Sequence, residues 1–266
     1  MSGGGAKMVF ADSKERFANR VADYVRYRPG YPAAIVDLLR EECALRPEHV
    51  IADIGSGTGL LAEIFLKNGN RVIGVEPNAE MRSGGDEYLK PYATFRSVAG
   101  SAETTTLDTA SVDFVVAGQA FHWFEPSAAR REFLRILKPH GWVVIVWNDR
   151  LEDTRFAREY EELLQRYGTD YKNVKDSYPE MSKIQDFFVS PDFAARDFPN
   201  FQLFDLEGLR GRLRSSSYAP REGHANFTPL IVELEELFHD HAQGGTVRME
   251  YVTHAYFGHL RTGPKG

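Results

Sequence analysis

The sequence predicts a single α/β domain built on a mostly parallel sheet. Short apolar segments alternate with helical patterns from residue 50 onward, which is typical of strand–helix–strand units. The segments are continuously apolar, as expected for strands that are buried on both faces. We find no composition break that marks a second domain, so residues 1–266 are assigned to one domain.

The expected elements follow from apolar periodicity and from glycine and proline punctuation. Strands are predicted at 50–54, 71–76, 94–99, 112–117, 142–147, 201–206 and 246–257. Helices are predicted at 59–67, 78–89, 127–137, 151–168 and 227–241. A strand, a helix and a strand come last, and they predict a closing hairpin-like pair at one end of a seven-stranded sheet.

Composition restricts the possible partners. The chain has 32 Lys plus Arg against 38 Asp plus Glu, whereas nucleic-acid binding favours a basic face. The one cysteine, Cys43, excludes an intrachain disulfide. There is no apolar run of about 18 residues that would span a membrane and no signal-peptide pattern at the start. We therefore expect a cytoplasmic protein with no nucleic-acid or membrane partner, and the oligomeric state stays open.

A glycine-rich segment follows the first predicted strand. Asp53 lies near the end of that strand, and Gly55, Gly57 and Gly59 follow at every second position. Side chains at these glycines would keep a nucleotide-like ligand away from the backbone. The dinucleotide fingerprint G-x-G-x-x-G requires a sixth-place glycine, where Leu60 stands. An ordinary turn that uses glycine for positive φ is the structural alternative, but an adenosine-bearing cofactor is favoured.

The acid followed by G-x-G-x-G resembles motif I of the class I S-adenosylmethionine (SAM)-dependent methyltransferases. The resemblance implies a Rossmann-like seven-stranded sheet flanked by helices. It also implies in-line transfer of a methyl group from SAM, with S-adenosylhomocysteine as the product. In that family the loop backbone, here Gly55, Ser56, Gly57 and Gly59, receives the methionine part of the cofactor, and Asp53 stands nearby.

The second predicted strand ends at Glu76, followed by Pro77 and Asn78. A carboxylate at this place can accept two hydrogen bonds from a ribose diol; a solvated charge at the strand end is the alternative. The resemblance implies the ribose role for Glu76. It also implies that Asn78 and Met81, on the next helix, flank the adenine, so all four residues are predicted to bind the cofactor.

The third strand leads into Gly100-Ser101-Ala102-Glu103. Many members of the family have aspartate at the second of these positions, where it accepts from the adenine amino group. Ser101 departs from that pattern, so the Ala102 backbone amide or Glu103 would then serve. Alternatively, Glu103 caps the turn before the next strand. Ser101, Ala102 and Glu103 are all predicted to line the cofactor site.

The fourth strand ends in polar and aromatic residues, at the edge where open α/β sheets bind ligands. Gln119 and Phe121 are predicted to contact the cofactor, and His122 and Trp123 are the candidate catalytic residues. His122 would act as a general base or an orienting donor, unless it is a packed histidine. Trp123 and Phe121 would wall the sulfonium or the substrate, since cations favour aromatic faces; core packing is the alternative.

Further segments look like a small-molecule methyltransferase subgroup that includes trans-aconitate-type enzymes. They are 26–32, 113–124, 137–141, 217–220 and 251–260. The resemblance implies that residues 1–45 form a helical cap over the cofactor, with Tyr24 and Arg28 in contact with it. Residues 151–198 are interpreted as an α-rich, aromatic, lid-like insertion after the fifth strand that excludes water from the site.

The predicted activity is SAM-dependent methyl transfer to an oxygen, nitrogen or carbon nucleophile of a small molecule. Two alternatives stay open: a SAM-binding protein without catalysis, and an NAD-dependent oxidoreductase. An RNA or protein methyltransferase is disfavoured by the acidic balance. No metal site is predicted. Arg210, Arg212 and Arg214 are interpreted as a surface run, with an anion site for an acidic substrate as the alternative.

Overall fold

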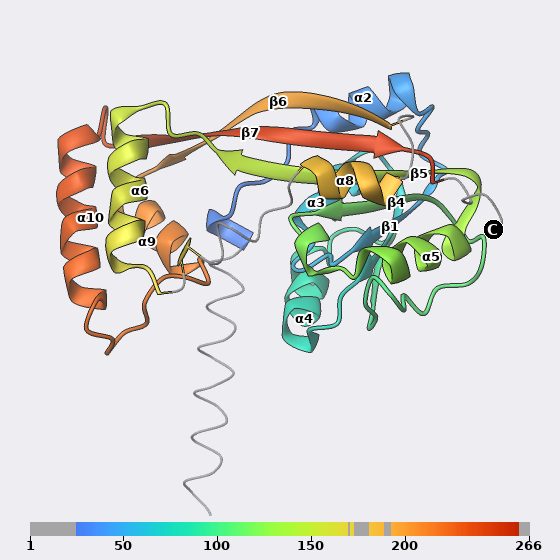
Figure 1. The fold of residues 1–266 in the computed structure, drawn as a ribbon, viewed down its shortest axis with the longest axis horizontal. Helices are drawn as coiled ribbons and strands as arrows, with labels where there is room; N and C mark the ends of the chain where they lie inside the picture. The colour runs from blue at the N-terminus through green and yellow to red at the C-terminus, as the bar shows by residue number, and fades with distance from the viewer. Residues whose placement is uncertain (1–24, 170, 173–180, 189–192, 261–266) are drawn as a thin grey trace, which may run out of the picture.

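A computed structural model of the chain describes residues 25–169, 171–172, 181–188 and 193–260. One seven-stranded sheet runs through the molecule in the order β3-β2-β1-β4-β5-β7-β6 (Figure 1). The first five strands are parallel to their neighbours, and β7 and β6 add antiparallel pairs at one edge. The strands are β1 (Val50–Ile54), β2 (Arg71–Val75), β3 (Phe95–Val98), β4 (Val112–Gly118), β5 (Leu137–Arg150), β6 (Phe193–Phe204) and β7 (Val247–Gly258). The predicted fold class, including the closing antiparallel pair, is confirmed.

Helices cover both faces of the parallel part of the sheet. The apolar residues of α2 (Ala34–Glu42) and α3 (Leu60–Lys67) pack with one set of strand side chains, among them Ile51 and Val116. The apolar residues of α5 (Pro126–Ile136) and α8 (Met181–Phe188) pack with the other set, among them Ala52 and Val115. Neighbouring strand residues thus point to opposite helical layers, which explains the continuously apolar strands.

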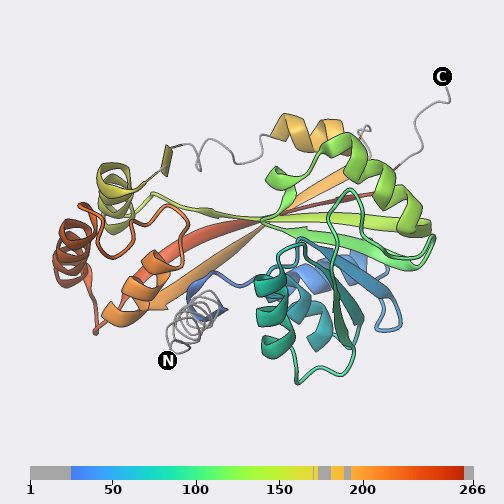
Figure 2. The same ribbon diagram turned by 90° about the horizontal axis from the view of Figure 1, so that it is seen from below.

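The three strands β5, β6 and β7 are longer than the others. The far ends of β6 and β7 carry a second hydrophobic core, in which they pack against α6 (Arg155–Tyr167), α9 (Leu206–Arg214) and α10 (Phe227–His241). Figures 1 and 2 show these helices as a separate helical lobe at the opposite end of the long strands from β1 and α5. The fold therefore has one continuous sheet and two cores.

The lid-like insertion predicted at 151–198 is not one structural unit. The helix predicted at 151–168 is present as α6, but it belongs to the helical lobe. Phe187 and Phe188 of α8 are buried in the core beneath α5. The last residues of the range are already in β6, which begins at Phe193, eight residues before the predicted strand start. The aromatic composition therefore reflects core packing, and residues 173–180 and 189–192 lie outside the described residues.

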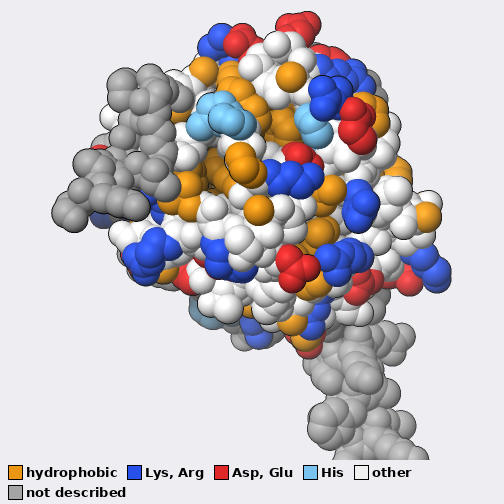
Figure 3. Space-filling model, turned by 90° about the vertical axis from the view of Figure 1, so that its right-hand side faces the viewer, with side chains coloured by type: hydrophobic (Ala, Val, Ile, Leu, Met, Phe, Trp, Pro, Cys, Tyr) orange, Lys and Arg blue, Asp and Glu red, His pale blue; other side chains and the backbone are white. Residues whose placement is uncertain are grey.

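The surface toward α5 at the right of Figure 1 carries charges of both signs. Lys and Arg side chains are interspersed there with Asp, Glu and apolar side chains (Figure 3). A nucleic-acid site generally needs a continuous basic stripe, so this face is not of that kind. In the part of the chain that the structure describes, no helix has the length and apolar character needed to cross a bilayer.

Candidate functional site

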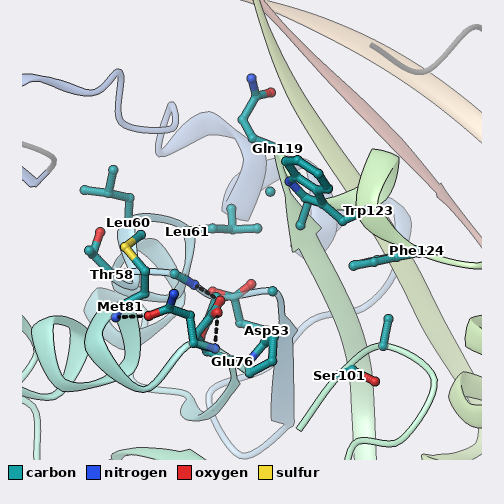
Figure 4. Close-up of a pocket in the computed structure, with 18 of the residues that line it drawn as sticks. Asp53, Thr58, Leu60, Leu61, Glu76, Met81, Ser101, Gln119, Trp123 and Phe124 are labelled. Carbon is teal, nitrogen blue, oxygen red and sulfur yellow. Dashed lines mark hydrogen bonds between the residues drawn. The ribbon is translucent and has the colours of Figure 1, made fainter. Parts of the chain in front are cut away.

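A cavity of about 740 Å³ opens at the carboxyl ends of β1, β2 and β4. β1 and β4 are neighbours in the sheet, although two strands separate them in sequence. This is the point where the strand order reverses, and open α/β sheets bind ligands there. The volume is within the roughly 300–1,000 Å³ typical of small-molecule sites. Figure 4 shows Asp53 and Glu76 on one side of the cavity and Trp123 on the other.

The loop after β1 has the backbone that its glycines predict. Gly55, Gly57 and Gly59 have φ values of 68°, 54° and 84°, in the left-handed region that disfavours other residues. A Cβ atom at Gly55 would lie 2.7 Å from the Ala120 Cβ on the facing strand end. Gly55, Ser56 and Gly57 line the cavity, and Gly59 serves as the N-cap of α3 behind it. The loop backbone is therefore open to a ligand.

Asp53 is a buried acid that faces the cavity. Its exposed fraction is 1%, and neither carboxylate oxygen accepts a hydrogen bond from the residues that the structure describes. Burial raises the pKa of Asp53 to about 7; the nearby Ala62 backbone amide opposes this rise, and the negative charge of Glu76 adds to it. A buried carboxylate without a partner is costly. A cationic ligand group in the cavity would provide the missing partner.

Glu76 joins the end of β2 to the glycine loop. Its Oε2 accepts a hydrogen bond from the Gly57 amide over 3.0 Å, and its Oε1 accepts one from the Asn78 amide over 2.8 Å. Asn78 in turn caps α4 (Ala79–Tyr88), because its side chain accepts from the Glu80 and Met81 amides. Each carboxylate oxygen has a second lone pair, so Glu76 can still accept from a ligand diol. Pro77, Asn78 and Met81 also line the cavity.

The loop after β3 forms the far wall, with Ser101, Ala102 and Glu103 lining the cavity. Ala102 is buried in the main core, and Ser101 pairs with Thr104 in a short antiparallel bridge. Glu103 Oε1 accepts a hydrogen bond from the Glu125 amide over 2.9 Å. This contact ties the loop to the start of α5. Glu103 therefore has a capping contact, as the alternative interpretation expected, but the contact is to the N-cap residue of α5 rather than within the turn before β4.

Gln119 extends the pairing of β4 with β5 through its side chain. Its Oε1 accepts a hydrogen bond from the Asn148 backbone amide over 2.6 Å, and the Gln119 backbone amide donates to the Val146 carbonyl. Gln119 also has a positive φ of 53°, which is uncommon outside glycine. This conformation ends the strand, and the turn that follows brings Trp123 and Phe124 to the cavity. Gln119 itself lies in the cavity wall.

The three aromatic side chains after β4 have different environments. Trp123 lines the cavity with 79% of its surface exposed. His122 lies outside the lining residues, with its ring 4.5 Å from that of Trp123 and 5.2 Å from that of Trp147. Burial lowers the pKa of His122 to about 4. Phe121 is packed in the core against Phe187, with ring centroids 5.0 Å apart, and it is not among the residues that line the cavity, in correction of its predicted role.

The predicted N-terminal contacts are only partly described. Tyr24 lies outside the described residues. Arg28 does not line the main cavity; it borders a second cavity of about 300 Å³, and its Nη2 donates to the Ser215 carbonyl over 2.7 Å. Instead, Tyr31 reaches the main cavity, where its hydroxyl is so close to Gly118 that a Cβ atom there would lie 2.5 Å away.

Sequence reasoning missed several lining residues: Tyr31, Thr58, Leu60, Leu61, Gly118, Ala120, Phe124 and Ser217. The apolar residues among them adjoin the glycine loop or the end of β4, so their position in the sequence could have predicted that they line the cavity. Ser217 comes from the helical lobe; it lies in the segment 217–220 that resembles the subgroup, but its own residue type does not connect it to the cavity.

Comparisons with known proteins agree with this geometry. Residues 52–145 match the family model described as a methyltransferase domain. An uncharacterized methyltransferase-like protein of Schizosaccharomyces pombe is 34% identical over 83% of this chain and 85% of its own length. An uncharacterized methyltransferase of Mycobacterium tuberculosis is 36% identical over 59% of this chain and 62% of its own. The chain belongs to the methyltransferase family.

A solved structure from Anaeromyxobacter dehalogenans, named as a type II methyltransferase, has the same fold. It superimposes with a TM-score of 0.63 at 20% identity, over 88% of this chain and 98% of that one. The similarity includes the sheet whose carboxyl edge carries the cavity.

Proposed function

We propose that the protein transfers a methyl group from SAM to a small molecule, and that the cavity between β1 and β4 binds SAM. The observation that carries this proposal is Asp53, a fully buried carboxylate without a hydrogen-bond partner among the described residues, in the wall of a cavity beside the glycine loop. SAM has a cationic sulfonium and an ammonium group, and either complements that charge. NAD has a pyrophosphate, which a buried carboxylate at this place would repel.

The residues around the cavity fit the remaining parts of the cofactor. The open backbone at Gly55 and Gly57 allows close approach of a chain-like methionine moiety. Glu76 has acceptor capacity for the ribose hydroxyls, and Met81 packs against Gly57 on the side where an adenine would lie. Ser101 and Ala102 form the wall beyond. We assign the ribose to Glu76 and the adenine to the space between Met81 and the β3 loop.

The bound sulfonium supplies an activated methyl group, so the protein's main contribution is alignment and exclusion of water. Holding two reactants in line can supply roughly 7–11 kcal/mol of barrier reduction. Trp123, Phe124 and Tyr31 line the cavity, with Trp123 across from Glu76 (Figure 4), and we assign them to the acceptor side. His122 has a low pKa and is packed between two tryptophans. We therefore favour a positioning role, in which His122 supports Trp123, over a role as general base.

A small-molecule acceptor is supported by the size of the cavity and by the resemblance to the trans-aconitate-type subgroup. The acceptor side lies between the two lobes, because Ser217 of the helical lobe borders the same cavity as Gly55 of the sheet. A carboxylate or phenolate acceptor would need no base, which agrees with the placement of His122.

Equilibrium binding of SAM, S-adenosylhomocysteine and NAD to the full chain tests the cofactor assignment. We expect both sulfur cofactors to bind and NAD to fail. A labelled-methyl assay against small acids, phenols and amines then tests turnover. Tight SAM binding without transfer to any of them would favour the non-catalytic alternative, and preference for NAD would overturn the proposal.

A further inference from the structure

The base of the helical lobe contains a group of buried arginine and tyrosine side chains. Arg150 comes from the end of β5, Tyr160 from α6, Arg212 from α9, and Tyr218 from the segment after α9. These side chains are packed close together: the Arg150 guanidinium lies 4.9 Å from the centre of the Tyr160 ring. We call these four residues the Arg–Tyr cluster.

Arg212 is a buried cation without an acidic partner in the described part of the chain. Its exposed fraction is 7%. Its Nη1 donates to Ser216 Oγ over 2.8 Å, and its Nε donates to the Tyr251 hydroxyl over 3.4 Å. Both acceptors are neutral. Arginine is almost never fully buried unless it is paired, so its charge requires a negative group that these contacts do not supply.

The sequence places Arg212 between two surface arginines, and the structure separates them. Arg210 forms ion pairs with Glu207 and Glu235, and Arg214 lies 4.0 Å from Glu207. The interpretation of a surface run therefore holds for Arg210 and Arg214 and is wrong for Arg212. Arg212 points inward because it lies on the same face of α9 as Gly208 and Leu209, which are buried.

Tyr160 adds an independent observation. It is 1% exposed, and its hydroxyl makes no hydrogen bond to the residues that the structure describes. A buried hydroxyl normally has a partner. Although burial raises the pKa of Tyr218, the charges of Arg212, Arg28 and Arg150 outweigh it and hold that pKa below its usual value. The cluster therefore combines an excess of positive potential with an unused hydroxyl donor.

Arg150 is partly neutralised. It forms an ion pair with Glu161 and donates to the Tyr171 hydroxyl over 3.1 Å. The Arg150–Glu161 pair leaves the positive charge of Arg212 uncompensated within the cluster.

The cluster adjoins the methyl-transfer cavity through residues 215–218. Ser216 contacts Arg212, Ser217 lines the cavity, and Tyr218 packs in the cluster. The N-terminal segment covers this junction: a Cβ atom at Gly211 would lie 2.1 Å from the Tyr27 ring, and Arg28 bonds to Ser215. Figures 1 and 2 show this segment beside α9. Ser217 is therefore the link: it lines the cavity, and its two chain neighbours contact or belong to the cluster.

We propose that Arg212 and the Tyr160 hydroxyl bind an oxyanion, the acidic end of the methyl acceptor, so that the substrate class is a small carboxylate or phosphate. This rests on the proposed function for the identity of the ligand, but anion binding is measurable by itself. An oxyanion would neutralise Arg212 and accept the hydrogen bond that Tyr160 has to offer, and charge-assisted bonds of this kind are the stronger ones.

The test is thermal stabilisation of the full chain by succinate and by inorganic phosphate, each at constant ionic strength. Succinamide, which is neutral and similar in shape, is the control ligand. We expect saturable stabilisation by at least one of the two anions and none by succinamide. Stabilisation by succinate assigns the site to carboxylates, and stabilisation by phosphate assigns it to phosphorylated acceptors. If neither anion exceeds succinamide, the proposal is overturned.

Variants locate the binding. Arg212→Gln and Tyr160→Phe should each weaken the anion, by roughly 10- to 100-fold for the charged group. Tyr160→Phe removes only an unpartnered hydroxyl, so it should fold even if Arg212→Gln does not. Arg210→Gln, on the same helix, is the matched control and should bind like the unmodified chain. Equal anion binding by all three variants would sink the proposal. Both cluster variants should still bind S-adenosylhomocysteine, because the cluster is separate from the proposed cofactor site. If the unmodified chain binds an anion but not S-adenosylhomocysteine, the proposed function fails and the anion site stands.

Discussion

The Gly57 amide donates a hydrogen bond to Glu76 Oε2 over 3.0 Å. This bond joins the glycine loop after β1 to the end of β2, so that two separate sequence motifs form one wall of the cavity. The same carboxylate accepts from the Asn78 amide through its other oxygen. Glu76 is thus held by backbone groups through both oxygens, and it still lines the cavity.

Glu76→Gln should weaken SAM binding by roughly 10- to 100-fold, because hydrogen bonds to a charged group contribute more than those to a neutral one. The amide also replaces one acceptor oxygen by a donor, which opposes a backbone N–H. Isothermal titration calorimetry with SAM measures the effect. Glu80→Gln, an exposed change in the first turn of α4, is the control. Equal loss in both variants would show that overall charge, rather than the ribose contact, is responsible.

Asp53→Asn should stabilise the free protein at about pH 8 and weaken its SAM binding. The raised pKa of about 7, against 3.8 for the unperturbed group, means that the folded state binds this proton more tightly than the unfolded state. Stability is therefore lost as pH rises from about 4 to about 7, and above that the ionised acid costs on the order of 2–4 kcal/mol. Urea unfolding at about pH 4 and about pH 8 checks this. A stabilised variant that keeps full SAM affinity would contradict the role of Asp53.

His254 should make stability fall in mild alkali. Its Nδ1 lies 2.7 Å from Asp197 Oδ1, and its Nε2 lies 3.3 Å from Asp149 Oδ2. Hydrogen bonding to Asp149, and then to Asp197, raises the pKa of His254 from 6.5 to about 9. The protonated ring stabilises the fold fully below pH 6.5, and this contribution is lost as pH rises through about 9.

The contribution of His254 is about 1–2 kcal/mol, since the Asp197 side chain is mostly exposed and solvent screens the pair. Unfolding free energies at about pH 6 and about pH 9.5 should differ by this amount in the unmodified chain. His254→Gln should remove the difference. The same pH dependence in the variant would assign it to another group.

Trp123→Ala should lower kcat/KM at least about tenfold with a stability change within about 0.5 kcal/mol. The exposed fraction of this side chain is 79%, so little packing is lost, whereas the acceptor side of the cavity loses its largest wall. Steady-state kinetics and thermal unfolding measure the two effects. Phe201 is another exposed aromatic residue; it lies on β6, with the Arg248 guanidinium of β7 over its ring. Phe201→Ala should leave kcat/KM unchanged.

His122→Gln should lower kcat/KM by about twofold to tenfold, through the loss of ring contacts to Trp123 and Trp147. Because the pKa of His122 is about 4, its ring stays neutral above about pH 5.5. The pH profile of kcat should therefore keep its shape in the variant. Disappearance of an acid limb near neutral pH would restore the general-base role.

Local patterns carried most of the fold prediction. The alternation of continuous apolar segments with helical periodicity is a property of neighbouring residues, and it located all five parallel strands. The ends of the strands were predicted less accurately. β5 begins at Leu137, directly after α5, although Pro139 and Gly141 indicated a loop between the helix and a strand at 142–147. Leu137 already pairs with Val112 of β4, and after a register shift the pairing resumes at Trp142 with Phe114, so residues more than twenty positions away in sequence decide where β5 begins.

The aromatic residues of 151–198 illustrate where local reasoning stops. Composition alone does not distinguish a ring that closes a site from a ring that fills a core, because both are apolar and bulky. Phe187 contacts Phe121 and Phe133, and those partners lie more than fifty residues earlier. The same ambiguity applies to Phe121, whose place in the core depends on where α8 packs.

The sequence by itself determined the succession of the five parallel strands with helices between them, the glycine backbone after β1 and the acids at the ends of β1 and β2, because these follow from local periodicity and from φ preferences. Only the tertiary structure decided which side chains share an environment. It buried Asp53 in the wall of the cavity, placed Phe121 in the core and enclosed Arg212 among tyrosines while its neighbours Arg210 and Arg214 stayed at the surface. Burial depends on which distant segments close over a residue, and that information is in no local pattern.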